Sequence, residues 1–276
     1  MKLETAVWVD AEDMFRYACG AHYNLRKWFL LRYAKSARIQ SFVQSAFWEL
    51  GAVPVIDFLT AFAIDAVRNK KRTEIVESLK RITETFHDGK DSLSEDEVST
   101  QCMFPNTMSF PVADQDVKLE AKSNIISLRG FASSLRLKGE SNIVILSGDE
   151  QDLDARQEAF GNLIICMGHQ NDIKCNDCIV ILVGHSNTVT GANNTVISFG
   201  DSSTINAVSN CEVFLDGDSN RLNLTGGKVA FYMTQPIYLQ KDGKDLLGRV
   251  RDTDDKLIQL DTDYRCEYAT SNIVEI

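Results

Sequence analysis

A repeat of about sixteen residues runs through the middle of the chain and limits the folds that it can adopt. Glycine followed by a polar residue recurs at Gly168, Gly184, Gly200 and Gly217, in steps of 16, 16 and 17. Between these glycines, a small polar residue two positions before an aliphatic residue recurs in steps that alternate between 9 and 7, with one step of 8. Positions repeated at this period stack on one another in a parallel β-solenoid with two short strands per coil.

The repeat continues towards the N-terminus with a longer period. Asn124, Ser133 and Asn142 keep the small-polar motif in steps of 9, which predicts early coils of about 18 residues. The next member that we assign is Asn162, so the polar residues 149–160 are predicted to form an insertion that loops outward or makes a short helix.

The motif reaches Gly227 and then stops. The remaining residues are predicted to form short strands joined at 241–244 and 253–256. A terminal cap is expected there because the last coil of a solenoid exposes apolar side chains and open backbone groups.

Residues 1–88 have helical periodicity instead. Gly51 and Pro54 separate two of the expected helices. Five helices are predicted, at residues 11–18, 23–34, 39–50, 55–68 and 73–86. The predicted fold class is therefore α+β, with a helical bundle (1–88), a linker and lead-in strand near 108–112 (89–120), a parallel β-solenoid of about 16–18 residues per coil (121–229) and a β cap (230–276).

Charge also divides the chain. Residues 1–90 carry 14 Lys/Arg and 11 Asp/Glu, whereas residues 91–276 carry 15 and 28, so their net charges are +3 and −13. This asymmetry predicts two domains with different partners. Neither a long apolar segment nor a signal peptide is recognised, so we expect a cytoplasmic protein without a membrane partner. The seven cysteines are expected to be reduced thiols, several of them facing inward.

His169 and His185 occupy one position of adjacent coils, with Asp201 and Asp218 next in the same column. Such a row could bind a transition metal or perform acid–base catalysis. The alternative is a solvated turn column in which the residue after each glycine is simply polar, and we favour that interpretation.

Cys175 and Cys178 have the spacing of a zinc site, with Cys166 and His169 nearby. However, Cys178 falls at the small inward position of the repeat, where a stacked side chain is expected. No cofactor, metal or catalytic residue is therefore predicted, and His169, His185, Cys175 and Cys178 remain the candidates if a metal binds.

The asparagines of the repeat are predicted to form a structural ladder along the solenoid. Asn171 and Asn187 are assigned to one face, and Asn194, with Ser203 and Asn220 nearby, to the other. The competing hypothesis is a flat recognition face for a repetitive ligand such as a glycan. Its members would be Thr188, Thr190, Thr195, Ser198 and Thr204.

Two basic clusters lie in the helical region. One alternates with aromatic residues, as nucleic-acid patches do, and consists of Arg26, Lys27, Arg32, Lys35 and Arg38. The other consists of Arg68, Lys70, Lys71 and Arg72. Because the region has a net charge of only +3, we interpret both as solvated helix faces and do not expect direct nucleic-acid binding.

The end of the chain resembles an uncharacterised phage and prophage family with repetitive small-residue coils and a closing segment. The resemblance rests on residues 254–258 (Asp-Asp-Lys-Leu-Ile), 261–265 (Asp-Thr-Asp-Tyr-Arg) and 273–276 (Ile-Val-Glu-Ile). It covers the repeats and the segment after them and excludes the helical region. Its motifs have structural rather than catalytic character, and the resemblance implies an origin in a mobile element.

These observations predict a non-enzymatic binding protein whose acidic solenoid binds or blocks a host protein with a basic surface. An acidic rod can imitate a nucleic-acid duplex, and a phage origin makes an inhibitor of host defence a concrete version. The alternatives are a structural or adhesive virion protein and an enzyme that uses the His169/His185 column. A homo-oligomer is expected, through the helical domain or the solenoid. The predicted binding residues are Asp149, Glu150, Asp152, Asp154, Asp201, Asp216 and Asp218.

Overall fold

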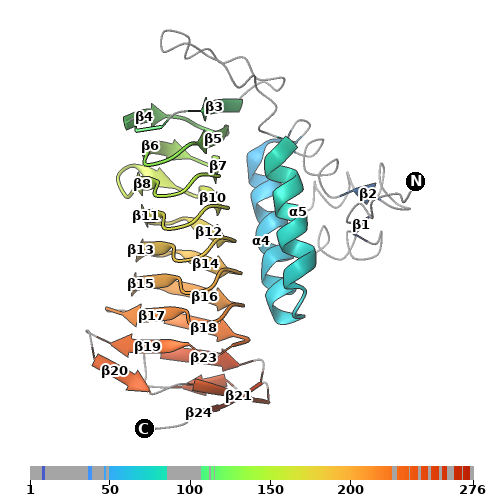
Figure 1. Cartoon of the computed structure of the whole chain (residues 1–276), viewed down its shortest axis with the longest axis vertical. Helices are drawn as coiled ribbons and strands as arrows, with labels where there is room; N and C mark the ends of the chain where they lie inside the picture. The colour runs from blue at the N-terminus through green and yellow to red at the C-terminus, as the bar shows by residue number, and fades with distance from the viewer. Residues whose placement is uncertain are drawn as a thin grey trace.

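The structure is a computed structural model. It describes residues 8–9, 37–38, 47, 50–85, 107–111, 113–114, 116–225, 229–235, 237–241, 244–247, 250–254, 257–259, 264–268 and 270–273. Its main body is a parallel β-solenoid of about seven turns over residues 116–239. Figure 1 shows the coils as stacked rungs with two helices alongside.

Each coil contributes one strand to each of two sheets. The first sheet, here called the covered sheet, contains β3 (Thr107–Pro111), β5 (Ile125–Arg129), β7 (Ile143–Leu146), β10 (Leu163–Cys166), β12 (Ile179–Leu182), β14 (Thr195–Ser198), β16 (Cys211–Leu215) and β18 (Val229–Met233), followed by β23 (Tyr264–Tyr268) and β22 (Leu257–Gln259). The second, the open sheet, contains β4 (Asp116–Glu120), β6 (Ser134–Glu140), β8 (Asp152–Ala155), β11 (Asp172–Cys175), β13 (Thr188–Ala192), β15 (Thr204–Ser209), β17 (Arg221–Leu224), β19 (Tyr238–Lys241) and β20 (Lys244–Leu247).

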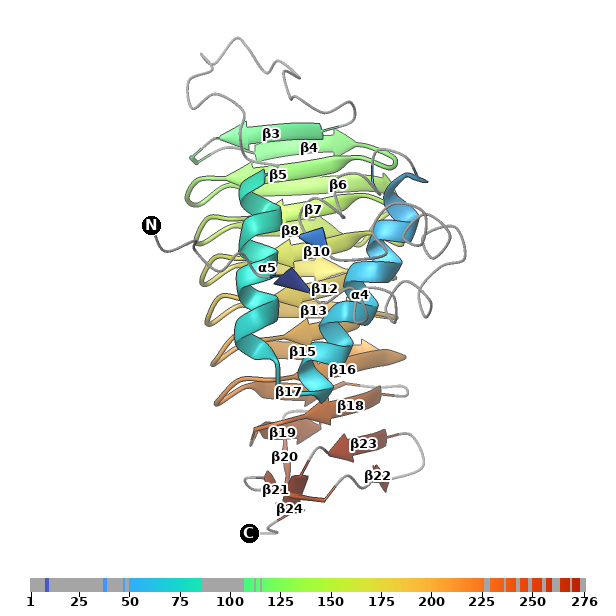
Figure 2. The same cartoon turned by 90° about the vertical axis from the view of Figure 1, so that its right-hand side faces the viewer.

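Two helices cover the outer face of the first sheet. Helix α4 (Ala52–Arg68) and helix α5 (Arg72–Thr85) run across its strands, as Figure 2 shows. Apolar side chains of both helices share one hydrophobic cluster with outward residues of the sheet such as Ile165, Ile181 and Phe214. Burying one such side chain fully stabilises the fold by about 1.5–3 kcal/mol. The described helices and the solenoid therefore share a core.

Burial explains the different sequences of the two sheets. Strands of the covered sheet, such as β10 and β12, are apolar at nearly every position because both of their faces are buried. Strands of the open sheet, such as β11 and β13, alternate between buried and half-buried residues because their outer face meets solvent. The inward residues of both sheets form a second cluster inside the solenoid.

The start of helix α4 follows its sequence signals. Gly51 is the N-cap, with φ 87°, a left-handed conformation that favours glycine. Pro54 lies in the first helical turn, where its missing N–H costs no intrahelical hydrogen bond. The predicted fourth and fifth helices are thereby confirmed. The first three lie outside the described residues, apart from the helical Phe47 and Leu50, so the helical bundle stays a prediction.

Polar ladders close the two turns of each coil, as predicted for the asparagines. The backbone N–H of Asn171 donates to Asn187 Oδ1 at 2.9 Å, and Asn187 Nδ2 donates to the carbonyl of Gly168 at 3.0 Å. Ser203 and Asn220 continue this same column, so their assignment to the face of Asn194 was wrong. The other column holds Asn142, Asn162, Cys178, Asn194 and Cys211.

Glycines are required where consecutive coils approach most closely. A Cβ on Gly184 would lie 1.8 Å from the carbonyl oxygen of Gly168, and one on Gly168 would lie 1.8 Å from that of Gly148. No larger residue fits without displacing backbone. This close approach explains why the glycine in the repeat does not vary between coils.

Coil lengths agree with prediction, but the insertion was misplaced. Residues 125 and 143 pair, as do 163 and 179, which gives coils of 18 and then 16 residues. In the longer coil between them, Asp152–Ala155 forms strand β8 in register with its neighbours, so residues 149–160 do not loop outward as a unit. Gln151 occupies the corresponding position of the ladder. It was not predicted as a member of the repeat, because the side chain of glutamine is one methylene longer than that of asparagine.

The solenoid also extends beyond the predicted limits of 121–229. The predicted lead-in strand is β3, which pairs in parallel with β5, and β4 pairs with β6. At the other end, Val229 rather than Gly227 stands next to Cys211. Strands β19 and β20 pair antiparallel on either side of the predicted turn at 241–244, which confirms that connection. At the second predicted connection, 253–256, β21 (Val250–Asp254) precedes β22, and residues 255–256 lie outside the described residues.

Five strands of the described residues lie outside the order of the two main sheets. Strand β9 (Ala159–Phe160) pairs with the end of β6, β24 (Thr270–Ile273) with β21, and β1 (Trp8–Val9) with β2 (Ala37–Arg38). Among the described helices, none has the length and hydropathy needed to cross a membrane.

Candidate functional site

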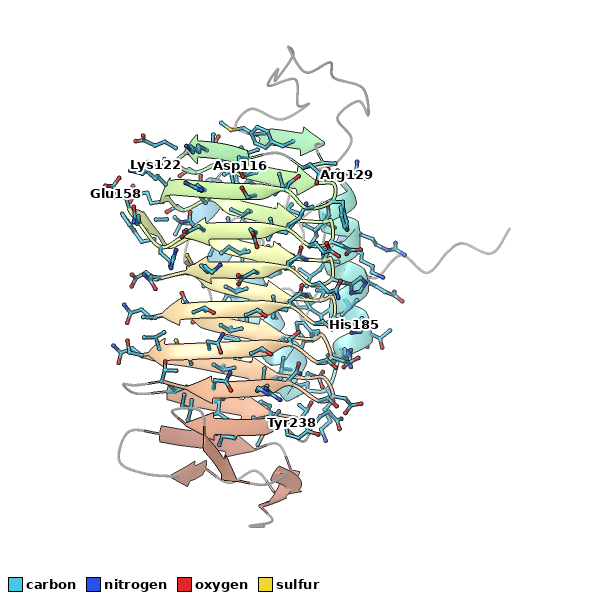
Figure 3. All side chains as sticks on the ribbon, turned by 60° about the vertical axis from the view of Figure 1, so that its left-hand side comes forward. Asp116, Lys122, Arg129, Glu158, His185 and Tyr238 are labelled. Atoms are coloured by element: carbon cyan, nitrogen blue, oxygen red, sulfur yellow. The ribbon has the colours of Figure 1, made fainter. Side chains whose placement is uncertain are left out.

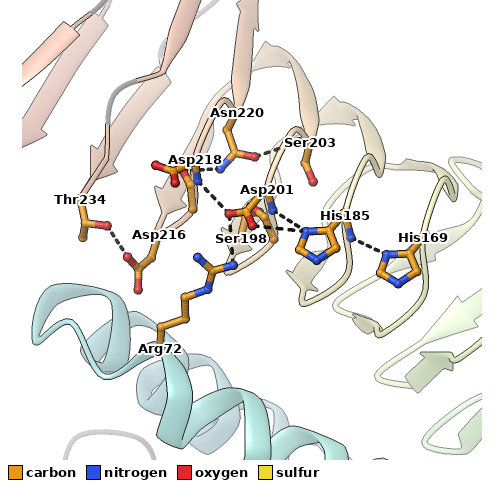
Figure 4. Close-up of polar contacts among 12 residues, drawn as sticks. Arg72, His169, His185, Ser198, Asp201, Ser203, Asp216, Asp218, Asn220 and Thr234 are labelled. Carbon is orange, nitrogen blue, oxygen red and sulfur yellow. Dashed lines mark hydrogen bonds and ion pairs between the residues drawn. The ribbon is translucent and has the colours of Figure 1, made fainter.

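One corner of the solenoid gathers the predicted histidines and several predicted carboxylates. This acidic corner is the turn between the covered and the open sheet, and Figure 4 shows part of it. One residue of each coil stands in its outer column: Phe131, Asp149, His169, His185, Asp201 and Asp218. The predicted stacking is confirmed, because the rings of His169 and His185 lie parallel with centroids 5.1 Å apart.

Four of the column residues, Asp149, His169, His185 and Asp201, accept a hydrogen bond from the backbone of the next coil. The N–H of His169 donates to Asp149 Oδ1 at 2.7 Å, and that of Asp218 donates to Asp201 Oδ1 at 2.8 Å. His169 Nδ1 accepts from the N–H of His185 at 2.9 Å, and His185 Nδ1 accepts from that of Asp201 at 3.3 Å. Aspartate and histidine therefore fill the same structural role in this column.

The two Nδ1 bonds fix the tautomer of both rings. A nitrogen that accepts an N–H carries no proton, so the proton of each neutral imidazole is on Nε2. A metal at Nε2 would require that proton to move to Nδ1, which would break the bond to the next coil. In the structure, both His169 and His185 accept a hydrogen bond from turn backbone, and His185 Nδ1 also lies 3.5 Å from Asp201 Oδ2.

A cation from the helices reaches this corner. Arg72 Nη2, at the start of α5, donates to Asp201 Oδ1 at 3.1 Å across 129 residues of sequence (Figure 4). Partial burial raises the pKa of Asp201, but hydrogen bonds from Arg72 and the Asp218 amide outweigh it and hold that pKa below its usual range. Arg72 was predicted to lie in a solvated cluster, and no local sequence signal connects it to Asp201.

Arg68, another member of this basic cluster, also contacts the solenoid. The Arg68 guanidinium lies over the rings of Phe214 and Tyr232, at 5.7 and 5.9 Å from their centroids. Burial raises the pKa of Asp216, and its hydrogen bond from Thr234 together with the charges of Arg72 and Lys70 only partly offsets that effect. The interpretation of Arg68 and Arg72 as merely solvated was therefore wrong.

The predicted acidic residues do not form one surface. Asp149, Glu150 and Asp218 are exposed at the acidic corner, where Asp201 is half-buried beside Arg72. Asp152 and Asp154 project from the open sheet. Asp216 is 6% exposed and belongs to the interface with the helices, so it is not available on the surface as predicted. The predicted patch of Arg26, Lys27, Arg32, Lys35 and Arg38 lies outside the described residues apart from the backbone of Arg38.

The cysteine candidates lie inside the solenoid. Cys166, Cys175, Cys178 and Cys211 are buried free thiols, as predicted, and burial raises the pKa of Cys166 to about 12. The neighbouring Cys178 sulfur and burial both raise the pKa of the Cys175 thiol. Among the described residues, no three His, Cys, Asp or Glu side chains are placed to hold a metal ion together.

The hypothetical threonine face is divided between the sheets. Thr188, Thr190 and Thr204 lie on the outer face of the open sheet, where Asn206 Nδ2 donates to Thr190 Oγ1 at 2.9 Å. Thr195 lies in the covered sheet, and Ser198 is buried inside the solenoid. Figure 3 shows the open sheet from Asp116 at one end to Tyr238 at the other, without a helix over it.

We compared the chain with family models, curated proteins and solved structures, and none of them matches it. The resemblance to phage proteins therefore stays a prediction.

Proposed function

We propose that this chain is a non-enzymatic binding protein that presents the acidic corner of its solenoid to a partner protein with a basic surface. The observation that carries the proposal is that Asp149, Glu150 and Asp218 are exposed along one edge of the solenoid, with Asp149 and Glu150 on one coil and Asp218 four coils further along. The solenoid residues 107–225 carry 15 Asp/Glu against 8 Lys/Arg, a net charge of −7, so the field around this edge attracts cations.

The spacing of the charges favours a protein partner over imitation of a duplex. Coils are about 4.8 Å apart, and some rungs of the corner carry histidine instead of a carboxylate. Duplex DNA carries one negative charge per about 1.7 Å, a much higher density. A few lysine or arginine side chains of a host protein match the corner better. The predicted phage origin supports a host protein as the target, and blocking of host defence is the specific version that we propose.

The proposal is tested with the full chain and two triple variants. Asp149→Asn, Glu150→Gln and Asp218→Asn remove three charges from the acidic corner; Glu120→Gln, Asp177→Asn and Glu212→Gln remove three exposed charges elsewhere. Proteins captured from host lysate are identified by mass spectrometry at low and high salt. We expect a basic protein that is released by salt, lost with the corner variant and kept by the control. Equal capture by both variants would contradict the proposal.

Homo-oligomerisation, through the helical domain or the solenoid, is part of the same proposal. It would place several acidic corners in one particle and strengthen binding without new contacts. Light scattering of the full chain measures the oligomeric state directly. A monomer at micromolar concentration would contradict the proposed homo-oligomer and leave the proposed partner binding unaffected.

A further inference from the structure

A hollow on the open sheet differs in chemistry from the acidic corner. It has a volume of about 420 Å³ and lies over β4, β6 and β8, beside the turn that follows β8. Its polar lining consists of Lys118, Arg136, Lys138, Asp154 and Gln157. Three of these five side chains are cations, in a solenoid that is acidic as a whole.

Two of the cations form no ion pair with described residues, although Asp154 stands opposite Arg136 and both Asp116 and Glu120 flank Lys118 along β4. Lys118 and Arg136 are register partners on adjacent strands, so their side chains leave the same face about 4.8 Å apart. Like charges directly opposite each other destabilise a sheet. Within the part of the chain that the structure describes, neither side chain forms an ion pair.

The other cations near the hollow are paired with carboxylates. Arg156 donates to both carboxylate oxygens of Asp154, at 2.9 and 2.7 Å, and Lys174 donates to Asp172 at 2.6 Å. Lys138 pairs with Glu158 at 2.9 Å. On strands β4, β6, β8 and β11, Lys118 and Arg136 at the hollow are therefore the cations that form no ion pair with described residues.

The lining and the size together indicate the class of ligand. A guanidinium fork beside an ammonium suits a phosphate or sulfate group, which accepts several charge-assisted hydrogen bonds. Asp154 and Gln157 suit hydroxyl groups. The carboxylate of Asp154 accepts hydrogen bonds, and the side-chain amide of Gln157 both accepts and donates them. A volume of about 420 Å³ exceeds what a bare ion fills and falls in the range of small-molecule sites.

We propose that this hollow binds a phosphorylated or sulfated sugar. The oxyanion lies between Lys118 and Arg136 and relieves their repulsion, and the sugar hydroxyls face Asp154 and Gln157. The site is separate from the acidic corner, so it does not depend on the protein partner proposed above.

Calorimetric titration of the full chain at low ionic strength tests the ligand class. The probes are glucose 6-phosphate, glucose 6-sulfate, glucose and inorganic phosphate. We expect at least one of the two esters to bind more tightly than glucose and inorganic phosphate, and their order identifies the source of the oxyanion. Absence of binding by both esters, or inorganic phosphate binding as tightly as they do, would overturn the proposal.

A matched pair of variants tests the site. Arg136→Gln removes a lining cation, and Lys174→Gln removes a cation from the same column but outside the hollow. We expect Arg136→Gln to weaken binding of the ester at least about tenfold, the effect of losing a charge-assisted hydrogen bond, and Lys174→Gln to leave it within about twofold. Equal weakening by both would show a diffuse surface field instead of a site. Because both side chains are on the solvent-facing side, circular dichroism is expected to show both variants folded.

Discussion

The covered sheet and the open sheet share the same rungs and the same inward core, yet their outer faces have opposite chemistry. Outward positions of the covered sheet carry residues such as Ile165, Ile181 and Ile197, which pack under α4 and α5. The corresponding side of the open sheet carries Asp, Lys, Thr and Asn. The backbone of a solenoid rung thus leaves the outer face free to vary, and what covers that face determines its residues.

The largest test of this difference places a charge on each outer face. Ile181 is fully buried under the helices, so Ile181→Asp is expected to cost about 4 kcal/mol or more of unfolding free energy. Thr190→Asp, on the open sheet, keeps an acceptor for Asn206 and is expected to change stability by less than about 1 kcal/mol. Urea denaturation measures both, and similar losses would mean that the helices do not cover the first sheet in solution.

The glycine column lies in the turn between the two sheets. Substitution of its glycines is therefore expected to lower stability whether or not a helix covers the neighbouring face. Gly184→Ala puts a Cβ 1.8 Å from the Gly168 carbonyl oxygen and is expected to cost about 3 kcal/mol. Gly161 has φ 63° and no atom within 4 Å of an added Cβ, so Gly161→Ala is expected to cost about 1 kcal/mol. Thermal melting of the two variants gives the order, and a reversed order would refute the close-approach argument.

The stability contributions of a buried and a partly exposed asparagine side chain can be compared in the same way. Asn187→Ala leaves the buried N–H of Asn171 without its acceptor and is expected to cost roughly 2 kcal/mol. Asn206→Ala, on the open face, is expected to cost less than about 1 kcal/mol because water can replace its partners. Equal losses in chemical denaturation would show that burial does not decide the contribution of a ladder.

Asp216 is a charge at the edge of the covered face, and its removal should stabilise the fold. Burial raises the pKa of this carboxyl, and its Oδ2 atom has no hydrogen-bond partner among the described residues. Its ionisation therefore lowers stability as the pH rises above the unfolded pKa of about 3.9. Asp216→Asn is expected to add up to about 1 kcal/mol at pH 7 and progressively less towards pH 4. A loss of stability at pH 7 would show that Arg72 and Lys70 compensate the charge.

The smallest effect is expected at the ion pair that links the helices to the acidic corner. Both side chains are about a third exposed, so solvent screening limits the Arg72–Asp201 coupling to less than about 1 kcal/mol in a double-mutant cycle with Arg72→Gln and Asp201→Asn. Because the folded pKa of Asp201 is lowered, this contribution is present above the unfolded pKa and is lost as the pH falls through the folded value. A coupling that did not decrease in acid would contradict the assignment.

The repeat made the solenoid, its coil lengths and its polar ladders predictable, because stacking imposes the same residue at each step. It did not reveal which face was covered, although the continuous apolar run of residues 163–166 indicated a strand buried on both sides. We interpreted the helices as a separate bundle because periodicity describes each segment alone. The misplaced insertion had a similar cause, since Gln151 replaces asparagine in the ladder.

The candidate sites were less predictable than the fold. The His169/His185 stack follows from the period, but the direction of the Nδ1 bonds depends on turn geometry that the repeat does not encode. Arg72 and Asp201 are 129 residues apart, and the cations Lys118 and Arg136 meet only through strand register. Such contacts require the pairing of strands and the docking of helices to be known.

The lengths of the two helices limit how many coils of the solenoid they can cover. Helix α4 has 17 residues and therefore spans about 25 Å, which corresponds to about five intervals between rungs. If a coil within the covered part of the solenoid were duplicated, its strand would add apolar outward side chains that α4 and α5 are too short to cover. Each added coil must therefore be matched by about three further residues in each helix, so that repeat number and helix length have to change together in evolution.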